Sequence, residues 1–295
     1  MRKTWRERTE LRGAVVLITG SGSGIGELMA VGAARRGARA VILWDIDEAA
    51  MGRVADRVAA LGVQAVPMPV DVRDPEMVTG AAARVIEEFG SLDVLINNAG
   101  VVSGKYLLEL SEDEIERTFE VNVLAHYRTV RAFLPAMLER DRGLIVTVSS
   151  AGGLVGVPRM TDYCGSKFAA VGFAESMRVE LRRRGSNVGT LLVCPYFIGT
   201  GMFEGVATRV PVLLPIMRPQ DVAERTLDSI ESRRQRLVIP PFAQVILHIK
   251  GLPVPVVDAL TELFGINATM DRFQGRKPSA RPRSSQQRPD LRRSH

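Results

Sequence analysis

Residues 14–26, Ala-Val-Val-Leu-Ile-Thr-Gly-Ser-Gly-Ser-Gly-Ile-Gly, place an apolar run directly before a cluster of glycines. The run Ala14–Thr19 shows no polar alternation, which is typical of a strand buried on both faces of a parallel sheet. Glycines after such a strand allow a tight turn and a close approach of the backbone to a pyrophosphate. The helix that follows would offer free N–H groups to the same anion. Strand, glycines and helix together supply the context that a dinucleotide site requires.

Strands and helices alternate along the rest of the chain. We predict further strands near 40–44, 66–70, 92–96, 143–148, 188–193 and 237–239, with helices to about 36, from 47 and 74, and over 111–140, 161–184 and 219–231. This order implies right-handed βαβ crossovers. The predicted fold is α/β, a doubly wound, Rossmann-type parallel sheet with helices on both faces. We predict one domain over residues 1–274, including an apolar C-terminal extension over 237–274.

The charge of the chain is concentrated at its end. The formal net charge is +6, and residues 275–295 hold seven Lys/Arg and one Asp, so the rest is neutral. We predict a basic, disordered tail there and no nucleic-acid partner for the folded part. Two cysteines and three histidines without ligand spacing predict no metal site and a cytoplasmic, reducing location. No N-terminal signal or membrane-spanning run is expected.

Three acidic residues follow predicted strands. Asp45 ends the strand after the glycine loop, where a carboxylate accepts hydrogen bonds from the adenosine ribose and repels a 2′-phosphate, which favours NAD over NADP. Asp47 fits the N-cap of the next helix better than Asp45 does. Asp71 is placed to contact the adenine amino group, with an Asx turn as a nearly equal alternative.

Tyr163 and Lys167 are four residues apart on a predicted helix, so both can meet one ligand. A cation near a phenol favours the phenolate and lowers the phenol pKa toward the range of a useful base. The spacing alone is common on exposed helix faces. It becomes informative here because a cofactor site is predicted in the same domain.

In combination these motifs resemble the short-chain dehydrogenase/reductase family over about residues 12–232. The resemblance rests on the glycine motif, Asn97-Asn98-Ala99-Gly100, Asn122, Ser150 at the family's usual interval before Tyr163, and Pro195-Tyr-Phe-Ile198-Gly-Thr200. Tyr196 stands where the family usually has glycine.

The resemblance implies a catalytic set of Asn122, Ser150, Tyr163 and Lys167. Tyr163 would move the hydroxyl proton, Ser150 would donate to the substrate oxygen, Lys167 would lower the Tyr163 pKa and hold the nicotinamide ribose, and Asn122 would seat a relay water. The cofactor-binding residues it implies are Gly20, Ser23, Gly24, Ile25, Gly26, Asp45, Asp71, Val72, Asn98, Ala99, Gly100, Tyr163, Lys167, Pro195, Ile198 and Thr200. The expected cofactor is NAD.

A closer similarity links residues 194–205, Trp44-Asp45-Ile46 and the stretch from Leu263 to Asp271 to the branch containing epidermal retinol dehydrogenase and related retinol and 17β-hydroxysteroid dehydrogenases. It implies a hydrophobic alcohol or the matching carbonyl compound as substrate. That branch usually carries an N-terminal hydrophobic anchor, which this sequence does not show, so integral membrane insertion is not expected.

The apolar stretch 237–264 allows several interpretations. It can cover the substrate site, form a subunit interface, contact a membrane surface peripherally, or simply complete the core. For the whole chain we hold open an NADPH-dependent reductase and a non-enzymatic NAD-binding scaffold or sensor as alternative functions. The family's usual pairing through the helices of Asn122 and Tyr163 implies a homodimer or homotetramer.

Overall fold

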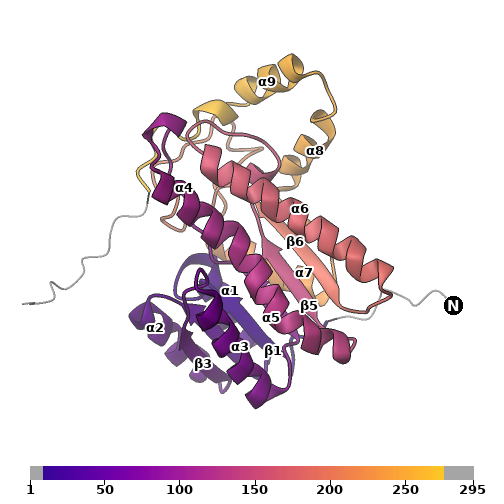
Figure 1. Cartoon of the computed structure of the whole chain (residues 1–295). Coiled ribbons are helices and arrows are strands. Elements are labelled where there is room, and N and C mark those ends of the chain that lie inside the picture. Colours follow the sequence, from indigo (N-terminus) through magenta and orange to yellow (C-terminus); the bar gives the residue numbers. More distant parts are fainter. Residues whose placement is uncertain (1–8, 276–295) are drawn as a thin grey trace, which may run out of the picture.

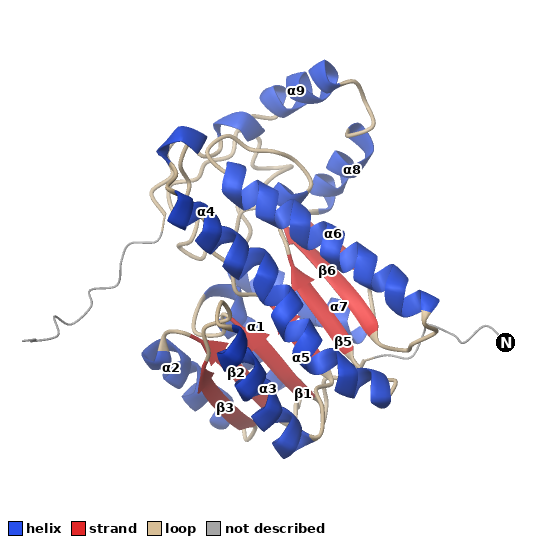
Figure 2. Ribbon diagram, in the orientation of Figure 1, coloured by secondary structure: helices blue, strands red, loops and turns tan. Residues whose placement is uncertain are grey.

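A single seven-stranded parallel sheet is the centre of the computed structural model, which describes residues 9–275 (Figure 2). Its strand order is β3-β2-β1-β4-β5-β6-β7. This confirms the doubly wound α/β fold. The strands are β1 (Val15–Thr19), β2 (Ala40–Asp45), β3 (Gln64–Pro69), β4 (Val94–Asn97), β5 (Leu144–Val148), β6 (Gly189–Pro195) and β7 (Arg236–Ile239).

Helices cover both faces of the sheet (Figure 1). On one face pack α1 (Gly24–Arg35), α2 (Glu48–Ala59) and α7 (Pro219–Glu231), and on the other α3 (Pro75–Phe89), α5 (Ala125–Glu139) and α6 (Thr161–Arg183). Along β1, Val16 and Ile18 belong to the first apolar layer, and Val15 and Leu17 to the second. Every residue of β1 is buried because successive side chains enter opposite layers.

Local sequence explains where several helices begin. The Asp47 side chain accepts a hydrogen bond from the Ala50 N–H, which confirms Asp47 as the N-cap of α2. Asp74 caps α3 in the same way, with Pro75 at the first helical position. Ser111 and Glu114 form a capping box at the start of α4 (Glu112–Phe119).

The predicted helix over 111–140 is not continuous. Residues Glu120–Leu124 form a π-helical turn between α4 and α5. Such single turns are frequent at functional sites, and Asn122 lies inside this one. The predicted strand ends are shifted by two or fewer residues, as for β3, where Pro67 and Pro69 are tolerated because the strand lies at the sheet edge.

After β7 the chain leaves the sheet and forms short pieces. These are a 3-10 turn (Pro241–Val245), α8 (Ile246–Ile249), α9 (Val254–Leu263) and a 3-10 turn (Ile266–Ala268). Figure 1 shows α8 and α9 at one end of the molecule, with α9 standing away from the sheet. None of the helices within residues 9–275 has the length and apolar content to cross a bilayer. The predicted tail lies outside the described residues apart from Gly275.

Candidate active site

The glycine loop joins β1 to α1 at the carboxyl edge of the sheet. Gly20 and Gly24 have φ of +65° and +61°, a conformation that L side chains rarely adopt. A Cβ on Gly26 would lie 2.1 Å from the Gly20 carbonyl oxygen, so a larger residue does not fit. The Ser23 side chain caps none of the N–H groups of α1. This tight cradle at a helix N-terminus fits the pyrophosphate of a dinucleotide.

The Asn-Asn-Ala-Gly motif after β4 fixes the shape of that loop. The Asn98 amide donates to the carbonyl oxygens of Thr19 at 3.0 Å and Gly20 at 3.2 Å. The Thr19 hydroxyl in turn accepts from the N–H groups of Asn98 and Ala99, each at 3.0 Å. Two loops that are far apart in the sequence therefore form one rigid unit.

Asp45 lies where the ribose-binding carboxylate was predicted, at the end of β2. Its two carboxylate oxygens accept from the backbone N–H groups of Gly22 at 2.7 Å and Asp47 at 3.0 Å. Neither bond makes Asp45 the N-cap of α2, a role that belongs to Asp47 as predicted. Each carboxylate oxygen has a second lone pair, so these bonds orient Asp45 beside the glycine loop and still leave acceptors for ribose hydroxyls.

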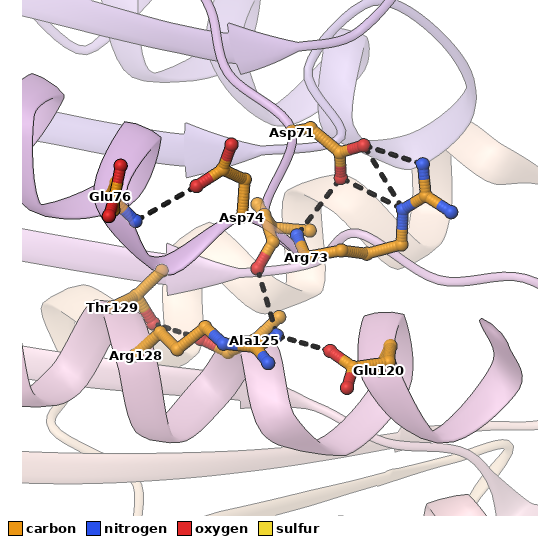
Figure 3. A network of polar contacts seen from close by, with 9 residues as sticks. Asp71, Arg73, Asp74, Glu76, Glu120, Ala125, Arg128 and Thr129 are labelled. Atoms are coloured by element: carbon orange, nitrogen blue, oxygen red, sulfur yellow. Dashed lines mark hydrogen bonds and ion pairs between the residues drawn. The ribbon is translucent and has the colours of Figure 1, made fainter. Parts of the chain in front are cut away.

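Asp71 is held by a neighbour that the prediction did not consider (Figure 3). The Arg73 guanidinium contacts both of its oxygens, with Nη2 to Oδ2 at 2.6 Å. The Arg73 N–H also donates to Oδ1 at 2.9 Å, so the Asx turn weighed as an alternative is present. The Arg73 hydrogen bond holds the pKa of the Asp71 carboxyl below its ordinary value. Any contact of Asp71 with adenine must share the carboxylate with Arg73.

A second ion pair in Figure 3 supports the residue after Asp71. Arg128 of α5 pairs with Glu120 at 2.6 Å and donates to the Val72 carbonyl oxygen at 3.4 Å. Val72 itself is buried beside Val121 and Ala125. The π-helical turn is thereby tied to the loop after β3.

Tyr163 and Lys167 lie one helical turn apart on α6, and both side chains are buried. The Lys167 ammonium lies 5.6 Å from the centre of the Tyr163 ring and donates to the Val148 carbonyl oxygen at 3.1 Å. Ser150 is a hydrogen-bond partner of the Tyr163 side chain. The fold thus brings three of the four predicted catalytic residues together.

The choice of Ser150 over Ser149 is consistent with their contacts. The Ser149 hydroxyl donates to the Lys167 carbonyl oxygen at 2.8 Å and is buried, so it has a structural role. The Ser150 oxygen accepts from the Gly152 N–H at 3.1 Å, and its hydroxyl, beside the Tyr163 phenol, makes a long 3.4 Å contact to the Pro195 carbonyl oxygen. Ser150 is therefore the serine that can donate a hydrogen bond to a substrate oxygen.

Asn122 joins the catalytic group from the π-helical turn. Its Oδ1 accepts from the Val101 N–H at 2.9 Å, and its Nδ2 donates to the Val101 carbonyl oxygen at 3.0 Å and to the Ser166 hydroxyl at 2.9 Å. A Cβ on Gly100 would lie 3.4 Å from Asn122 Oδ1 and 3.5 Å from Lys167 Nζ. Asn122 and Lys167 therefore both lie beside Gly100.

Burial sets the proton affinities of the two central groups. It raises the pKa of the Tyr163 phenol, an effect that the Ser150 hydrogen bond opposes. It lowers the pKa of Lys167 to about 8. The expected lowering of the Tyr163 pKa is not produced by the protein's own groups, because desolvation of the phenolate exceeds the help from its neighbours.

The loop after β6 closes on the glycine loop from the other side. Thr200 lies 3.5 Å from the Cβ position of Gly24, and Ile198 bridges to Met217. Tyr196 occupies the place of the usual glycine without disturbing this path, because its N–H donates to the Ile239 carbonyl oxygen at 2.7 Å and its ring is buried against Phe197.

Aromatic and aliphatic side chains surround Tyr163. The Phe203 ring lies edge-on to Tyr163 at 5.8 Å and to Phe197 at 5.1 Å. The same apolar cluster contains Leu154, Val155, Val157, Met160, Tyr196, Phe242 and Ile246. The surroundings of the phenol are thus hydrophobic.

His126 is a buried histidine next to the catalytic group that the motifs did not indicate. It lies one turn after Asn122, is 2 % exposed, and neither ring nitrogen has a hydrogen-bond partner among the described residues. Burial, and then the charge of Lys167, lowers the His126 pKa to about 3. The i, i+4 spacing from Asn122 was the available signal. A neutral, unpartnered imidazole therefore lies behind Lys167.

The comparisons with known proteins agree with this geometry. The pattern of the short chain dehydrogenase family matches residues 14–210. Epidermal retinol dehydrogenase 2 of Mus musculus is 39% identical over 275 residues, covering 92% of this chain and 89% of that protein. Estradiol 17-beta-dehydrogenase 11 of Mus musculus is 41% identical over 236 residues, covering 80% and 78%.

Among the solved structures that resemble this chain, one contains NAD and another contains NADP. A short chain dehydrogenase/reductase from Burkholderia phymatum in complex with NAD superposes with a TM-score of 0.76 at 31% identity, covering 84% of this chain and 96% of that one. A metagenomic short-chain oxidoreductase in complex with NADP gives 0.66 at 28% identity, covering 78% and 98%. These two structures therefore do not distinguish NAD from NADP as the cofactor of this chain.

Proposed function

The chain belongs to the short-chain dehydrogenase family, and on that premise we propose that it oxidises the alcohol of a hydrophobic molecule with NAD, or reduces the matching carbonyl compound. It is an oxidoreductase acting on alcohol groups, as its relatives are. The observation that carries the finer proposal is the buried pair of Tyr163 and Lys167, with the half-buried Ser150 beside Tyr163 and an apolar cluster around the phenol.

The residues divide the proton chemistry among them. When bound, NAD supplies the hydride acceptor. Tyr163 removes the hydroxyl proton, and Ser150 donates a hydrogen bond to the same substrate oxygen. Lys167, cationic below its pKa of about 8, favours the Tyr163 phenolate electrostatically and binds ribose hydroxyls. Because burial raises the Tyr163 pKa, alcohol oxidation should accelerate as the pH rises.

Asn122 and the π-helical turn provide the outlet for that proton. Both N–H groups of the Asn122 amide are used by Val101 and Ser166. A water seated there therefore binds the remaining lone pair of Oδ1 or the backbone carbonyl. Such a water lies next to Lys167 and can pass the proton on.

Asp45 supports NAD over NADP. Its carboxylate lies beside the glycine loop through the 2.7 Å bond from the Gly22 N–H, and a 2′-phosphate placed there would meet a like charge. Titration of NADH and NADPH by fluorescence should give a clearly smaller Kd for NADH. In Asp45→Asn the preference should shrink. An NADPH Kd equal to or below that of NADH in the native chain would favour the NADPH-dependent reductase instead.

The apolar surroundings of Tyr163 support a hydrophobic substrate. Retinoids, steroids and long-chain alcohols match the cluster of Phe203, Val155 and Met160, and the printed names of the relatives include retinol and estradiol dehydrogenases. We therefore place the substrate among hydrophobic alcohols. Direction in the cell then depends on the cofactor ratio.

A screen of NADH formation against retinoid, steroid and aliphatic alcohols tests the proposal. Tyr163→Phe should lose about 100-fold or more in turnover while still binding NADH. Tyr127→Phe, a half-exposed tyrosine on α5, is the matched control and should retain activity. Equal turnover of Tyr163→Phe and the native chain would remove the mechanism and leave the scaffold or sensor alternative.

We also propose self-association through α4, α5 and α6. With the π-helical turn between α4 and α5, these helices present the partly exposed apolar residues Phe119, Leu124 and Phe168. Their exposure supports the pairing implied by the family resemblance. Light scattering on the native chain should give a mass above that of a monomer.

A further inference from the structure

Residues 265–275, drawn in yellow in Figure 1, follow α9 and lie against loops at the carboxyl edge of the sheet. The first of these loops is the one after β6. Its Glu204 carbonyl oxygen accepts a hydrogen bond from the Gln274 N–H at 2.8 Å. A Cβ on Gly205 would lie 2.0 Å from the Arg272 carbonyl oxygen, so a larger residue does not fit where the two backbones meet.

The loop after β4 meets the same segment at Gly104. A Cβ on Gly104 would lie 2.0 Å from the Cε1 atom of Phe273, so the aromatic ring rests directly on the backbone of this loop. The Phe273 side chain also packs against the apolar cluster around Tyr163. The segment therefore extends from the loop after β6 to the loop after β4.

Arg159, in the loop after β5, supplies a charged contact to the segment. Its Nη1 donates to the Met270 carbonyl oxygen at 3.0 Å and makes a longer 3.4 Å contact to that of Asp271. Its guanidinium carbon lies 5.5 Å from the centre of the Tyr106 ring, which belongs to the loop after β4. Arg159 has a left-handed φ of +64°. A residue other than glycine keeps this conformation only where its surroundings fix it, and such residues concentrate at functional sites.

The segment also completes the apolar cluster around Tyr163. Met270 is fully buried and belongs to this cluster. Phe242 and Ile246, from the part of the chain before α9, pack into the same cluster. Of the interpretations that the sequence left open for 237–264, these contacts support the one in which the chain after β7 covers the substrate site.

We propose that residues 265–275 form a cover over the apolar substrate site and that Arg159 is the positioning residue that holds this cover closed. Arg159 acts through the backbone carbonyl of Met270 and not through the reacting atoms. A hydrogen bond from a charged donor is stronger than a neutral one, so a single side chain can hold the segment. The family pattern matches residues 14–210 and does not extend to the cover.

A closed cover has two consequences for the substrate. It keeps water away from Tyr163 and retains a hydrophobic alcohol beside the phenol. Met270, as the fully buried side chain of the cover, limits the size of the molecule that fits. These consequences rest on the proposed function. The closure of the segment by Arg159 does not, because it follows from the contacts of the protein alone.

Amide hydrogen exchange of the full chain, without substrate or cofactor, tests the closure. Arg159→Gly removes the guanidinium and keeps the left-handed backbone accessible. Exchange within 265–275 should rise about tenfold or more, because a charged donor to the segment is lost, while exchange in β4, β5 and β6 should stay unchanged. Arg233→Gly is the matched control. Arg233 is also left-handed, at φ +50°, and donates to the Asn187 carbonyl oxygen at 3.1 Å, but it precedes β7 at the opposite edge of the sheet.

Steady-state kinetics test the role in the substrate site. With decanol, Arg159→Gly should raise KM about tenfold with little change in kcat, and the Kd of NADH should stay the same. Met270→Ala should raise the ratio of kcat/KM for hexadecanol to that for decanol about tenfold, because the shorter side chain leaves room for a longer molecule. A purely structural methionine would change stability and leave this ratio as it is.

Four results would overturn the proposal. They are unchanged exchange of 265–275 in Arg159→Gly, an equal rise of exchange in the central strands, the same rise in Arg233→Gly, and an unchanged hexadecanol-to-decanol ratio in Met270→Ala. Arg159→Asn replaces the glycine variant if circular dichroism shows that it is unfolded, since asparagine also tolerates the left-handed conformation. Exchange needs no turnover. A native chain without dehydrogenase activity would therefore count against the proposed function, and the exchange result would still decide the closure by Arg159.

Discussion

The central strands of the sheet and helix α9 differ in how far their hydrophobic side chains are exposed. In β4, β5 and β6, aliphatic side chains are almost fully buried, and the carboxyl ends of these strands place Asn98, Ser150 and Pro195 at one edge of the sheet. In α9, Val254, Val256 and Leu263 are exposed, although they are aliphatic residues of the same types. The comparison teaches that apolar content alone does not identify the core. Helices cover both faces of a central strand, so its side chains are buried on either face. A surface helix, in contrast, has one face against the fold and one face toward solvent.

The largest expected effect is in the sheet. Leu95 in β4 is fully buried, so Leu95→Ala should lower the free energy of unfolding by about 2–5 kcal/mol through lost burial and a cavity. Chemical denaturation followed by circular dichroism measures it. A change far below this range would show that burial in β4 contributes little more to stability than the exposed residues of α9 do.

The glycine loop should respond nearly as strongly, through the backbone. Gly26→Ala places a Cβ 2.1 Å from the Gly20 carbonyl oxygen and should destabilise the fold by about 1–3 kcal/mol and abolish NADH binding. Gly52→Ala, inside α2 with open space around it, is the control and should gain about 0.5–1 kcal/mol. Thermal unfolding and NADH fluorescence give the two readouts. Normal NADH binding by Gly26→Ala would show that the loop is less tightly constrained.

His126 extends the comparison from buried apolar side chains to a buried polar one. Its pKa is lowered from 6.5 to about 3, so the folded state keeps it neutral while the unfolded state takes up a proton below about pH 6.5. This contribution to stability is complete above pH 6.5 and is lost as the pH falls toward 3, at about 1.4 kcal/mol per pH unit. Between pH 7 and 5, the free energy of unfolding obtained from denaturation curves should fall more steeply with falling pH in the native chain than in His126→Asn. Identical pH dependence in the two would place the imidazole in contact with water.

The smallest expected effect is in α9. Leu263→Ala should change the free energy of unfolding by no more than about 0.5 kcal/mol, because the side chain is 62 % exposed before the substitution. The same denaturation assay that is used for Leu95→Ala measures it. A loss as large as that of Leu95→Ala would mean that Leu263 is covered in solution, by another copy of the chain or by the residues beyond 275.

Much of the site could be predicted because it depends on short spacings. Tyr163 and Lys167 meet on one face of α6 since i and i+4 do so on any α-helix, and Asp47 caps α2 because an aspartate just before a helix can accept its free N–H groups. The partners of Asp45 and Asp71 could not be predicted. They depend on the path of the loops, which brings Gly22 to one carboxylate and the Arg73 guanidinium to the other.

The pKa of the Tyr163 phenol is a second property that spacing in the sequence does not determine. Sequence spacing placed a cation near the phenol, which lowers a pKa, but burial raises it more. Burial is set by residues from several elements, among them Phe203 and Leu154. The neutral state of His126 depends in the same way on packing between α5 and α6, where its ring lies 6.1 Å from that of Phe173.

By itself the sequence determined the alternation of strands and helices, the glycine loop and the catalytic residue types, because each depends on neighbours within a few residues. Only the tertiary structure decided the strand order, the meeting of Asn122, Ser150 and Lys167, and the outward face of α9. These features arise from contacts between distant parts of the chain. Which side of an amphipathic helix becomes buried is settled by what lies beside it, and a local pattern does not contain that neighbour.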